Sequence, residues 1–255
     1  MKNFTLFIMM SAFALQAQAV QKSLSRFPIE RSSLVGKKVL ALTFDDGPNR
    51  TSTRDILETL KEYEVPATFF VLGSLAKENS DVMKEIYDDG HLLANHTYSH
   101  QALGKVSFWS RKKTAKNQIS KAHDILAPYY RSSDRLFFRA PENSWHKSLS
   151  SYLNKQDELS KYVGPVMWDV GGSMNVKGNE ITQAADWACW VSPYKLSPSE
   201  CAQGYLNEIK RKKGGIVLLH DIHVSTAKML KILLPKLKEM GYSFVTLNEV
   251  ESLKK

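Results

Sequence analysis

The chain alternates short apolar runs with segments in which apolar residues recur at helical spacing. Such runs are typical of buried strands, and recurrence at i, i+3 and i+4 is typical of helices that pack one face on a core. The pattern predicts strands over 39–44, 67–72, 91–95, 136–138, 163–168, 216–219 and 244–247. It predicts helices that begin at Thr51 or Ser52 and that span 81–89 and 112–126.

Strands that alternate with helices imply a parallel sheet. About seven such units, with polar motifs at the strand ends, predict an α/β barrel whose functional site lies at the carboxyl ends of the strands. The length of 255 residues and the 43% hydrophobic content suit a single domain with one well-buried core.

The N-terminus has the features of a secretory signal. Lys2 precedes an apolar run over 4–15, and the sequence Ala17-Gln18-Ala19 follows it. We therefore predict a signal peptide over 1–19, cleaved after Ala19, and an exported protein that is periplasmic or secreted. A membrane anchor is the alternative, but the run is too short to span a bilayer, so no stable anchor is expected after cleavage.

Export also bears on the two cysteines, Cys189 and Cys201. Thiols persist as disulfides outside the cytoplasm, so a bridge that closes the short loop between them is favoured over two free thiols.

The formal net charge is +9, of which Lys2 would be lost with the signal. A cationic exported protein is drawn to anionic polymers of a cell wall or envelope. No nucleic-acid partner is expected, because the basic residues are dispersed and no nucleic-acid-binding motif is present. The basic clusters 111–113 and 210–213 are interpreted as solvated helix ends.

Two motifs together predict a divalent-metal site. The run 43–48 (Thr-Phe-Asp-Asp-Gly-Pro) is followed fifty residues later by an H-x-x-x-H motif. Asp46, His96 and His100 supply three ligands and leave an open position, as a catalytic zinc site requires. Asp45 then lies beside the metal, where a carboxylate can accept a proton from water. Either motif alone is commonly an ordinary turn or a coincidence, so the prediction rests on their conjunction.

Three further motifs follow in the sequence: 139–142 (Arg-Ala-Pro-Glu), 166–169 (Val-Met-Trp-Asp) and 215–223, which ends in His-Asp-Ile-His. With the first two, they make the chain resemble the polysaccharide deacetylases of carbohydrate esterase family 4, which share a chitooligosaccharide-deacetylase homology domain, and in particular peptidoglycan deacetylases. The resemblance covers about 37–250. It implies an irregular (β/α)7-type barrel, with 20–36 as a lead-in and 37–255 as the catalytic domain.

The resemblance also implies catalytic roles. Asp45 would be the general base, His220 the general acid that protonates the departing sugar nitrogen, and Arg139 the group that orients Asp45 and keeps it ionised. The family's ligand positions match Asp46 and the two histidines of the H-x-x-x-H motif. The implied cofactor is a divalent metal, best Zn²⁺, with Co²⁺ or another transition metal as alternatives.

Substrate contacts follow from the same motifs. Trp168 and Leu218 resemble the apolar residues of the acetyl-methyl pocket, although simple core packing is the alternative for each. A backbone N–H near Pro141 and Glu142 is expected to donate to the oxyanion. Glu142 replaces the aromatic or small residue usual at this position, and it would repel anionic substituents or bind a cationic glucosamine.

The fourth motif departs most from the pattern. The family carries there an aspartate that supports the general acid, followed by Asp-Trp, and we assign the supporting role to Asp169. An insert over about 174–198 is longer than is usual. Its three aromatics, Trp187, Trp190 and Tyr194, would either stack on sugar rings or form a small hydrophobic cap pinned by the disulfide, and the cap is slightly favoured.

The sequence thus predicts a metal-dependent hydrolase that removes N-acetyl groups from N-acetylglucosamine-type sugars of peptidoglycan and releases acetate. The expected partner is a cell-wall polysaccharide. Alternatives on the same site are a chitin-oligomer deacetylase and an O-acetyl esterase acting on acetylxylan. A different class is a catalytically silent glycan-binding protein, which the departures in the fourth motif would explain.

Overall fold

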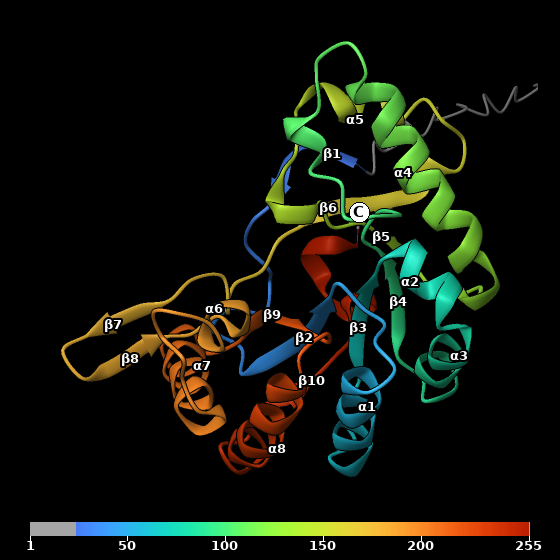
Figure 1. The fold of residues 1–255 in the computed structure, drawn as a ribbon. Helices are drawn as coiled ribbons and strands as arrows, with labels where there is room; N and C mark the ends of the chain where they lie inside the picture. The colour runs from blue at the N-terminus through green and yellow to red at the C-terminus, as the bar shows by residue number, and fades with distance from the viewer. Residues whose placement is uncertain (1–23, 255) are drawn as a thin grey trace, which may run out of the picture.

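The computed structural model describes residues 24–254, which fold as one α/β domain (Figure 1), so the prediction of a single α/β domain is confirmed. The predicted signal over 1–19 and the first residues of the lead-in lie outside the described range. Within that range, the structure contains no helix with the length and apolar character needed to cross a membrane.

The secondary structure follows the predicted alternation. The strands are β1 (Leu24–Ile29), β2 (Val39–Asp45), β3 (Ala67–Val71), β4 (Leu92–Asn95), β5 (Leu136–Phe137), β6 (Tyr162–Val166), β7 (Asn175–Lys177), β8 (Glu180–Gln183), β9 (Gly215–His220) and β10 (Ser243–Phe244). The α-helices are α1 (Ser52–Glu62), α2 (Gly73–Glu78), α3 (Ser80–Asp88), α4 (Arg111–Leu126), α5 (Ser148–Leu153), α6 (Asp186–Cys189), α7 (Pro198–Lys212) and α8 (Val224–Glu239).

The strands form two parallel groups that close into an irregular barrel. One group pairs in the order β10, β2, β3, β4, with β9 also on β2, and the other in the order β1, β6, β5. Two isolated bridges, Asn95 with Phe138 and Val170 with Val217, join the groups. Single bridges replace full ladders at these two junctions, and this accounts for the irregular closure.

The side chains of β2 alternate between two cores. Leu42 and Phe44 pack in the layer between the strands and the outer helices, whereas Ala41 packs inside the barrel. Successive residues of a strand point to opposite faces, so Thr43 and Asp45 share the inner face with Ala41. The strand therefore delivers the carboxylate of Asp45 to the mouth of the barrel.

Two element boundaries have local causes. The helix α1 begins at Ser52, as predicted, but Asn49 supplies the capping oxygen, which accepts from the backbone N–H groups of Thr51 and Ser52. The predicted strand over 244–247 ends at Phe244, because Thr246 opens a capped 3₁₀ turn (η5, Leu247–Glu249).

The predicted insert forms a β-hairpin of β7 and β8 followed by the one-turn helix α6. The hairpin extends away from the barrel, and its second strand packs against α7 (Figure 1). The predicted disulfide between Cys189 and Cys201 is present and links α6 to α7. The insert is therefore fastened to one outer helix.

Burial of His91 makes stability depend on pH. Burial lowers the pKa of His91 to about 4, and neither ring nitrogen has a hydrogen-bond partner among the described residues. An unfolded histidine takes up a proton near pH 6.5, whereas buried His91 does not. The contribution of His91 to the free energy of unfolding should therefore be fully present above pH 6.5 and fall by about 3 kcal/mol as the pH drops to 4. Urea unfolding at pH 7 and pH 4 measures this loss. His91→Leu should remove it, and an unchanged pH dependence in this variant would contradict the assignment.

Candidate active site

The register of two neighbouring strands brings an acid and a base face to face. Asp45, the last residue of β2, is the Cα partner of His220, the last residue of β9, and it is also the partner of Phe70 on β3. Adjacent strands lie about 4.8 Å apart, so a carboxylate and an imidazole flank the same point at the carboxyl ends of the strands. The predicted base and acid are thus brought together by main-chain pairing.

Asp46, His96 and His100 form the one group of three potential metal ligands within residues 24–254. Nε2 of His96 lies 3.3 Å from Oδ1 of Asp46, and Nε2 of His100 lies 3.1 Å from the same oxygen. Asp46 and His100 both have left-handed backbone conformations, with φ of 76° and 58°. These uncommon conformations turn both side chains back toward the barrel mouth.

The hydrogen bonds of His96 show that these three residues suit a cation. Nδ1 of His96 lies 3.0 Å from the carbonyl oxygen of Arg139, so in the neutral ring Nδ1 carries the proton and Nε2 carries a lone pair. That lone pair faces Oδ1 of Asp46, which has no hydrogen-bond partner. Two electron-rich atoms at this distance repel unless a positive charge lies between them, and a divalent metal supplies such a charge.

A positive charge beside Asp46, whether on a metal or on protonated imidazoles, also favours the ionised form of its carboxyl. Burial acts to raise the pKa of Asp46, but the imidazoles of His100 and His96 outweigh it and hold the pKa well below its usual range. The carboxylate is therefore ionised at neutral pH. Asp46 raises the pKa of His100 in turn, and burial of the imidazole opposes this rise.

Arg139 holds Asp45 in place from inside the barrel. Its Nη1 donates to Oδ1 of Asp45 at 2.7 Å and to Oγ1 of Thr43 at 2.9 Å, and its Nε donates to the carbonyl of Val166 at 3.0 Å. The guanidinium also lies 4.1 Å from the ring centre of Phe70. The predicted contact between Arg139 and Asp45 is therefore present, as a buried, hydrogen-bonded ion pair.

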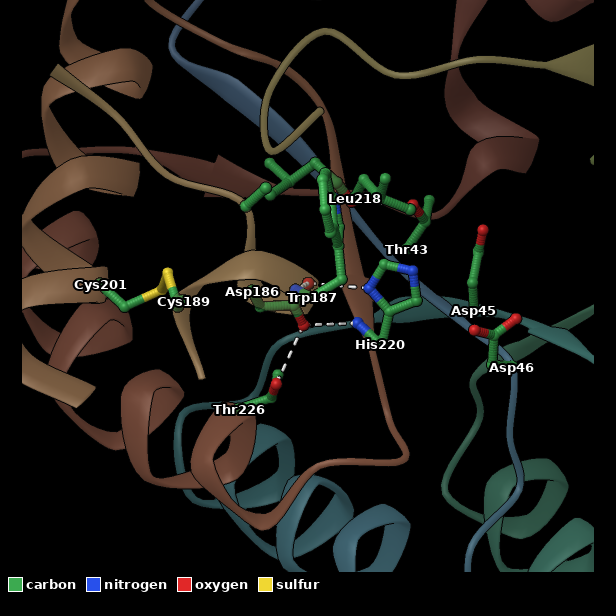
Figure 2. Close-up of polar contacts among 12 residues, drawn as sticks. Thr43, Asp45, Asp46, Asp186, Trp187, Cys189, Cys201, Leu218, His220 and Thr226 are labelled. Atoms are coloured by element: carbon green, nitrogen blue, oxygen red, sulfur yellow. Dashed lines mark hydrogen bonds and ion pairs between the residues drawn. A yellow bond between two sulfur atoms is a disulfide. The ribbon is translucent and has the colours of Figure 1, made fainter. Parts of the chain in front are cut away.

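His220 is supported by Asp186, which lies in the insert. Oδ1 of Asp186 lies 2.8 Å from Nδ1 of His220, and Oδ2 accepts from the backbone N–H of His220 at 2.7 Å and from the hydroxyl of Thr226 at 2.9 Å (Figure 2). Burial alone would lower the pKa of His220, but the carboxylate of Asp186 outweighs it and raises the pKa to about 9. The imidazole is thus held as a cation at neutral pH.

The prediction that Asp169 supports His220 is wrong. Its carboxylate instead accepts from the hydroxyl of Ser32 and from the backbone N–H of Ile216, at the opposite end of β9. Val170 bridges Val217 and the backbone N–H of Asp169 donates to the carbonyl of Ile216, so Asp169 lies near the start of β9, whereas the support for His220 has to come from beside the end of that strand. The sequence did carry a signal, because Asp186 and Trp187 form an Asp-Trp pair, as the fourth motif does in the family that the chain resembles, and they follow the β7–β8 hairpin.

A cavity of about 390 Å³ opens onto these groups. Its lining includes the acid, the base and the three metal-ligand candidates, together with Ala140, Glu142, Asn143, Trp168, Gly172, Trp187 and Leu218. Trp168, Leu218 and Glu142 thus lie where the sequence predicted, whereas Pro141 is buried and does not line the cavity. Glu142 is paired with Lys105 at 2.5 Å, which lowers the pKa of its carboxyl.

The three aromatics of the insert have different environments. Trp187 lines the cavity and is half exposed, in the position expected for a ring that stacks on a sugar. Trp190 packs against the outer core, as the hydrophobic-cap alternative predicts. Tyr194 is exposed and does not line the cavity. Only one of the three is therefore placed to contact a ligand in this cavity.

The ligand set predicts how metal binding responds to substitution. Asp46→Ala or His100→Ala should each lower zinc affinity by about 100-fold or more, because three ligands become two. Asp45→Asn should retain zinc, since Asp45 is bonded to Arg139. Isothermal titration with Zn²⁺ on each variant measures this difference. Loss of zinc in Asp45→Asn together with full retention in Asp46→Ala would reverse the two roles.

Known proteins resemble this chain in sequence and in fold. A family model described as polysaccharide deacetylase matches residues 33–158. The peptidoglycan-N-acetylmuramic acid deacetylase PdaC of Bacillus subtilis is 30% identical over 230 residues, which are 89% of this chain and 42% of the relative. Its solved structure is 29% identical, with a TM-score of 0.64 over 86% of this chain and 92% of that chain.

Two further proteins show that the relatives include both a named deacetylase and a pseudoenzyme. A peptidoglycan-N-acetylglucosamine deacetylase of Bacillus cereus is 31% identical over 215 residues, which are 83% of this chain and 67% of the relative. The solved structure of a family 4 pseudoenzyme from Bacillus anthracis is 27% identical, with a TM-score of 0.67 over 89% of this chain and 69% of that chain. The chain spans 42% of the length of the Bacillus subtilis relative. It belongs to the polysaccharide deacetylases of carbohydrate esterase family 4, a metal-dependent family with an α/β barrel fold.

Proposed function

We propose that this protein is an exported, zinc-dependent hydrolase that removes the N-acetyl group from N-acetylglucosamine of peptidoglycan. The observation that carries the proposal is the register pairing of Asp45 with His220 beside the three ligand candidates, on the wall of one cavity. Amide hydrolysis requires a base and an acid near the scissile bond, and the pairing of these two residues supports those roles.

The metal would be held by Asp46, His96 and His100. When bound, a divalent ion there supplies a Lewis acid for the acetyl carbonyl and makes water a stronger acid. The donor set of two imidazoles and one carboxylate suits Zn²⁺ and leaves at least one position open. The fixed tautomer of His96 supports this assignment, because its Nε2 lone pair is aimed at the other ligands.

Asp45 is the proposed general base. It lies at the cavity wall with one carboxylate oxygen bonded to Arg139, and its Oδ2 lies 3.8 Å from Nε2 of His96. A carboxylate so placed can take a proton from water that attacks the acetyl carbon. Arg139 fixes the orientation of the carboxylate and favours its ionised form, since a protonated acid could not accept.

His220 is the proposed general acid. An amine leaves poorly as an anion, so the sugar nitrogen has to be protonated as the carbon–nitrogen bond breaks. The contact with Asp186 keeps the ring charged at neutral pH and makes Nδ1 the bonded nitrogen, so Nε2 is free to donate. Acetate and a free amino sugar are the resulting products.

The oxyanion donor follows from the backbone of the turn at 141–143. Pro141 has no N–H group, and the N–H of Asn143 donates to the carbonyl of Ala140 within the turn. Glu142 has a left-handed conformation, with φ of 53°, and lines the cavity. Its N–H is therefore our candidate donor to the developing oxyanion.

The choice of substrate rests on relatives and on the cavity. The named relatives act on peptidoglycan, one on N-acetylmuramic acid and one on N-acetylglucosamine. Trp168, Leu218 and Trp187 give the cavity apolar walls, which suit an acetyl methyl group and the face of a sugar ring. Export and the net positive charge suit an anionic cell-wall polymer.

Acetate release tests the function directly. The zinc-loaded protein should release acetate from peptidoglycan, more than from chitin oligomers or acetylxylan, and chelation should abolish the release until Zn²⁺ or Co²⁺ is restored. Mass spectrometry of the digested glycan identifies the deacetylated sugar. Release that survives complete removal of metal would refute the zinc assignment. Binding to peptidoglycan with no acetate release from any substrate would make this chain a silent glycan-binding protein.

The contact between Asp186 and His220 predicts a shift in the pH profile. A raised pKa keeps His220 protonated up to about pH 9, so activity should fall only as the pH rises through that value. Asp186→Asn removes the charge, so the alkaline limb should move down by at least about one pH unit. The matched control is Asp169→Asn, which should weaken the fold without moving that limb. Equal shifts in both variants would show that Asp186 acts through stability alone.

A further inference from the structure

One face of α7 fastens the whole insert to the barrel. The residues Cys201, Gly204, Tyr205 and Glu208 follow one another at i, i+3, i+4 and i+7, so they lie along one side of this helix. Each of the four contacts the insert. We refer to these four residues as the α7 stripe.

The contacts of the α7 stripe run in order along the insert. Glu208 accepts from the backbone N–H of Gly171 at 3.1 Å and from Nε2 of Gln183 at 2.8 Å. At Gly204 an added Cβ would lie 2.6 Å from Cβ of Ala184, so only glycine permits this approach of hairpin and helix. The α7 stripe therefore contacts Gly171, where the chain leaves the barrel, and also the end of the β7–β8 hairpin.

The other two residues of the stripe hold the two ends of α6. At its beginning, the backbone N–H of Asp186 donates to the hydroxyl of Tyr205 at 3.0 Å. At its end, Cys189 is bonded to Cys201 (Figure 2). A four-residue helix is too short to be stable by itself, and a two-stranded hairpin adds little, so the position of α6 depends on these attachments.

Tyr205 also connects Asp186 to the strand that carries His220. Its hydroxyl accepts from Asp186 and donates to the carbonyl of Leu218 at 2.9 Å, and Leu218 lies two residues before His220 on β9. The hydroxyl is fully buried and makes both of these bonds at once. One oxygen atom thus sets the distance between the insert and β9 next to the contact of Asp186 with His220.

We propose that Tyr205 and the Cys189–Cys201 disulfide are positioning residues, which hold Asp186 against His220 and so set the acid side of the reaction. The inference rests on the proposed function in so far as His220 is the general acid. It extends that function, because the ability of His220 to donate a proton then depends on an outer helix and on a disulfide, both of which lie outside the cavity.

The test is the titration of His220 in the zinc-loaded protein, followed by NMR of its ring carbon, which requires no activity. Tyr205→Phe removes only the bridging oxygen, so we expect the His220 pKa to fall by about one unit or more, a tenfold loss of proton affinity. At pH 8 a fall of the pKa from about 9 to about 8 lowers the protonated fraction of His220 from about nine-tenths to about one half, so acetate release at that pH should fall by about twofold or more. The matched control is Tyr242→Phe. That hydroxyl bonds the carbonyl of Ile209 at the other end of α7, so its removal should leave the His220 titration unchanged.

A second variant keeps the proposal falsifiable if Tyr205→Phe does not fold. The double variant Cys189→Ala and Cys201→Ala should also lower the His220 pKa, and wild-type protein treated with a dithiol reductant should behave in the same way once both thiols are free. An unchanged His220 titration in Tyr205→Phe and in the double variant would overturn the proposal and leave both features as purely structural. A shifted titration in protein that releases no acetate would uphold the positioning role and reject the proposed function instead.

Discussion

The buried ion pair between Arg139 and Asp45 joins the two halves of this barrel. The guanidinium reaches from the end of β5 to the inner face of β2, bonds two carbonyls at the end of β6, and stacks on Phe70 of β3. Removing one partner of such a pair leaves an uncompensated buried charge, at a cost of about 3–5 kcal/mol. The barrel therefore encloses the carboxylate of Asp45 only because a cation is enclosed with it.

Arg139 also links Asp45 to the metal-ligand candidate His96. The carbonyl of Arg139 accepts the Nδ1 proton of His96, while the guanidinium of the same residue orients Asp45. One residue thus sets the tautomer of a metal-ligand candidate and the direction of the base. Both depend on the bridge of Asn95 with Phe138, which brings β4 beside the arginine.

The acid side of the cavity is built differently. The base and the metal-ligand candidates follow directly from barrel strands, whereas the partner of His220 comes from a segment that leaves the barrel after Val170 and returns at Asp186. Its position is set by α7, by Thr226 of α8 and by a disulfide. A loop-borne residue requires such attachments, because segments outside the regular elements have more conformational freedom to lose. The same segment brings Trp187 to the cavity wall. A shift of this segment would therefore alter both the contact of Asp186 with His220 and the shape of the cavity.

The sequence by itself determined the elements and most of the site. Apolar runs located the barrel strands except β1, which lies in the segment taken as a lead-in. The runs 43–48 and 96–100 identified Asp45, Asp46, His96 and His100, because each motif is short and contiguous in the sequence. Only the tertiary structure decided which aspartate supports His220. Asp169 and Asp186 each adjoin a tryptophan in the sequence, but Asp169 lies at the start of β9 and Asp186 at its end, and no local pattern reports that distance. The same holds for Tyr205, which reads as a core tyrosine of an amphipathic helix until β9 and α6 are placed on either side of its hydroxyl.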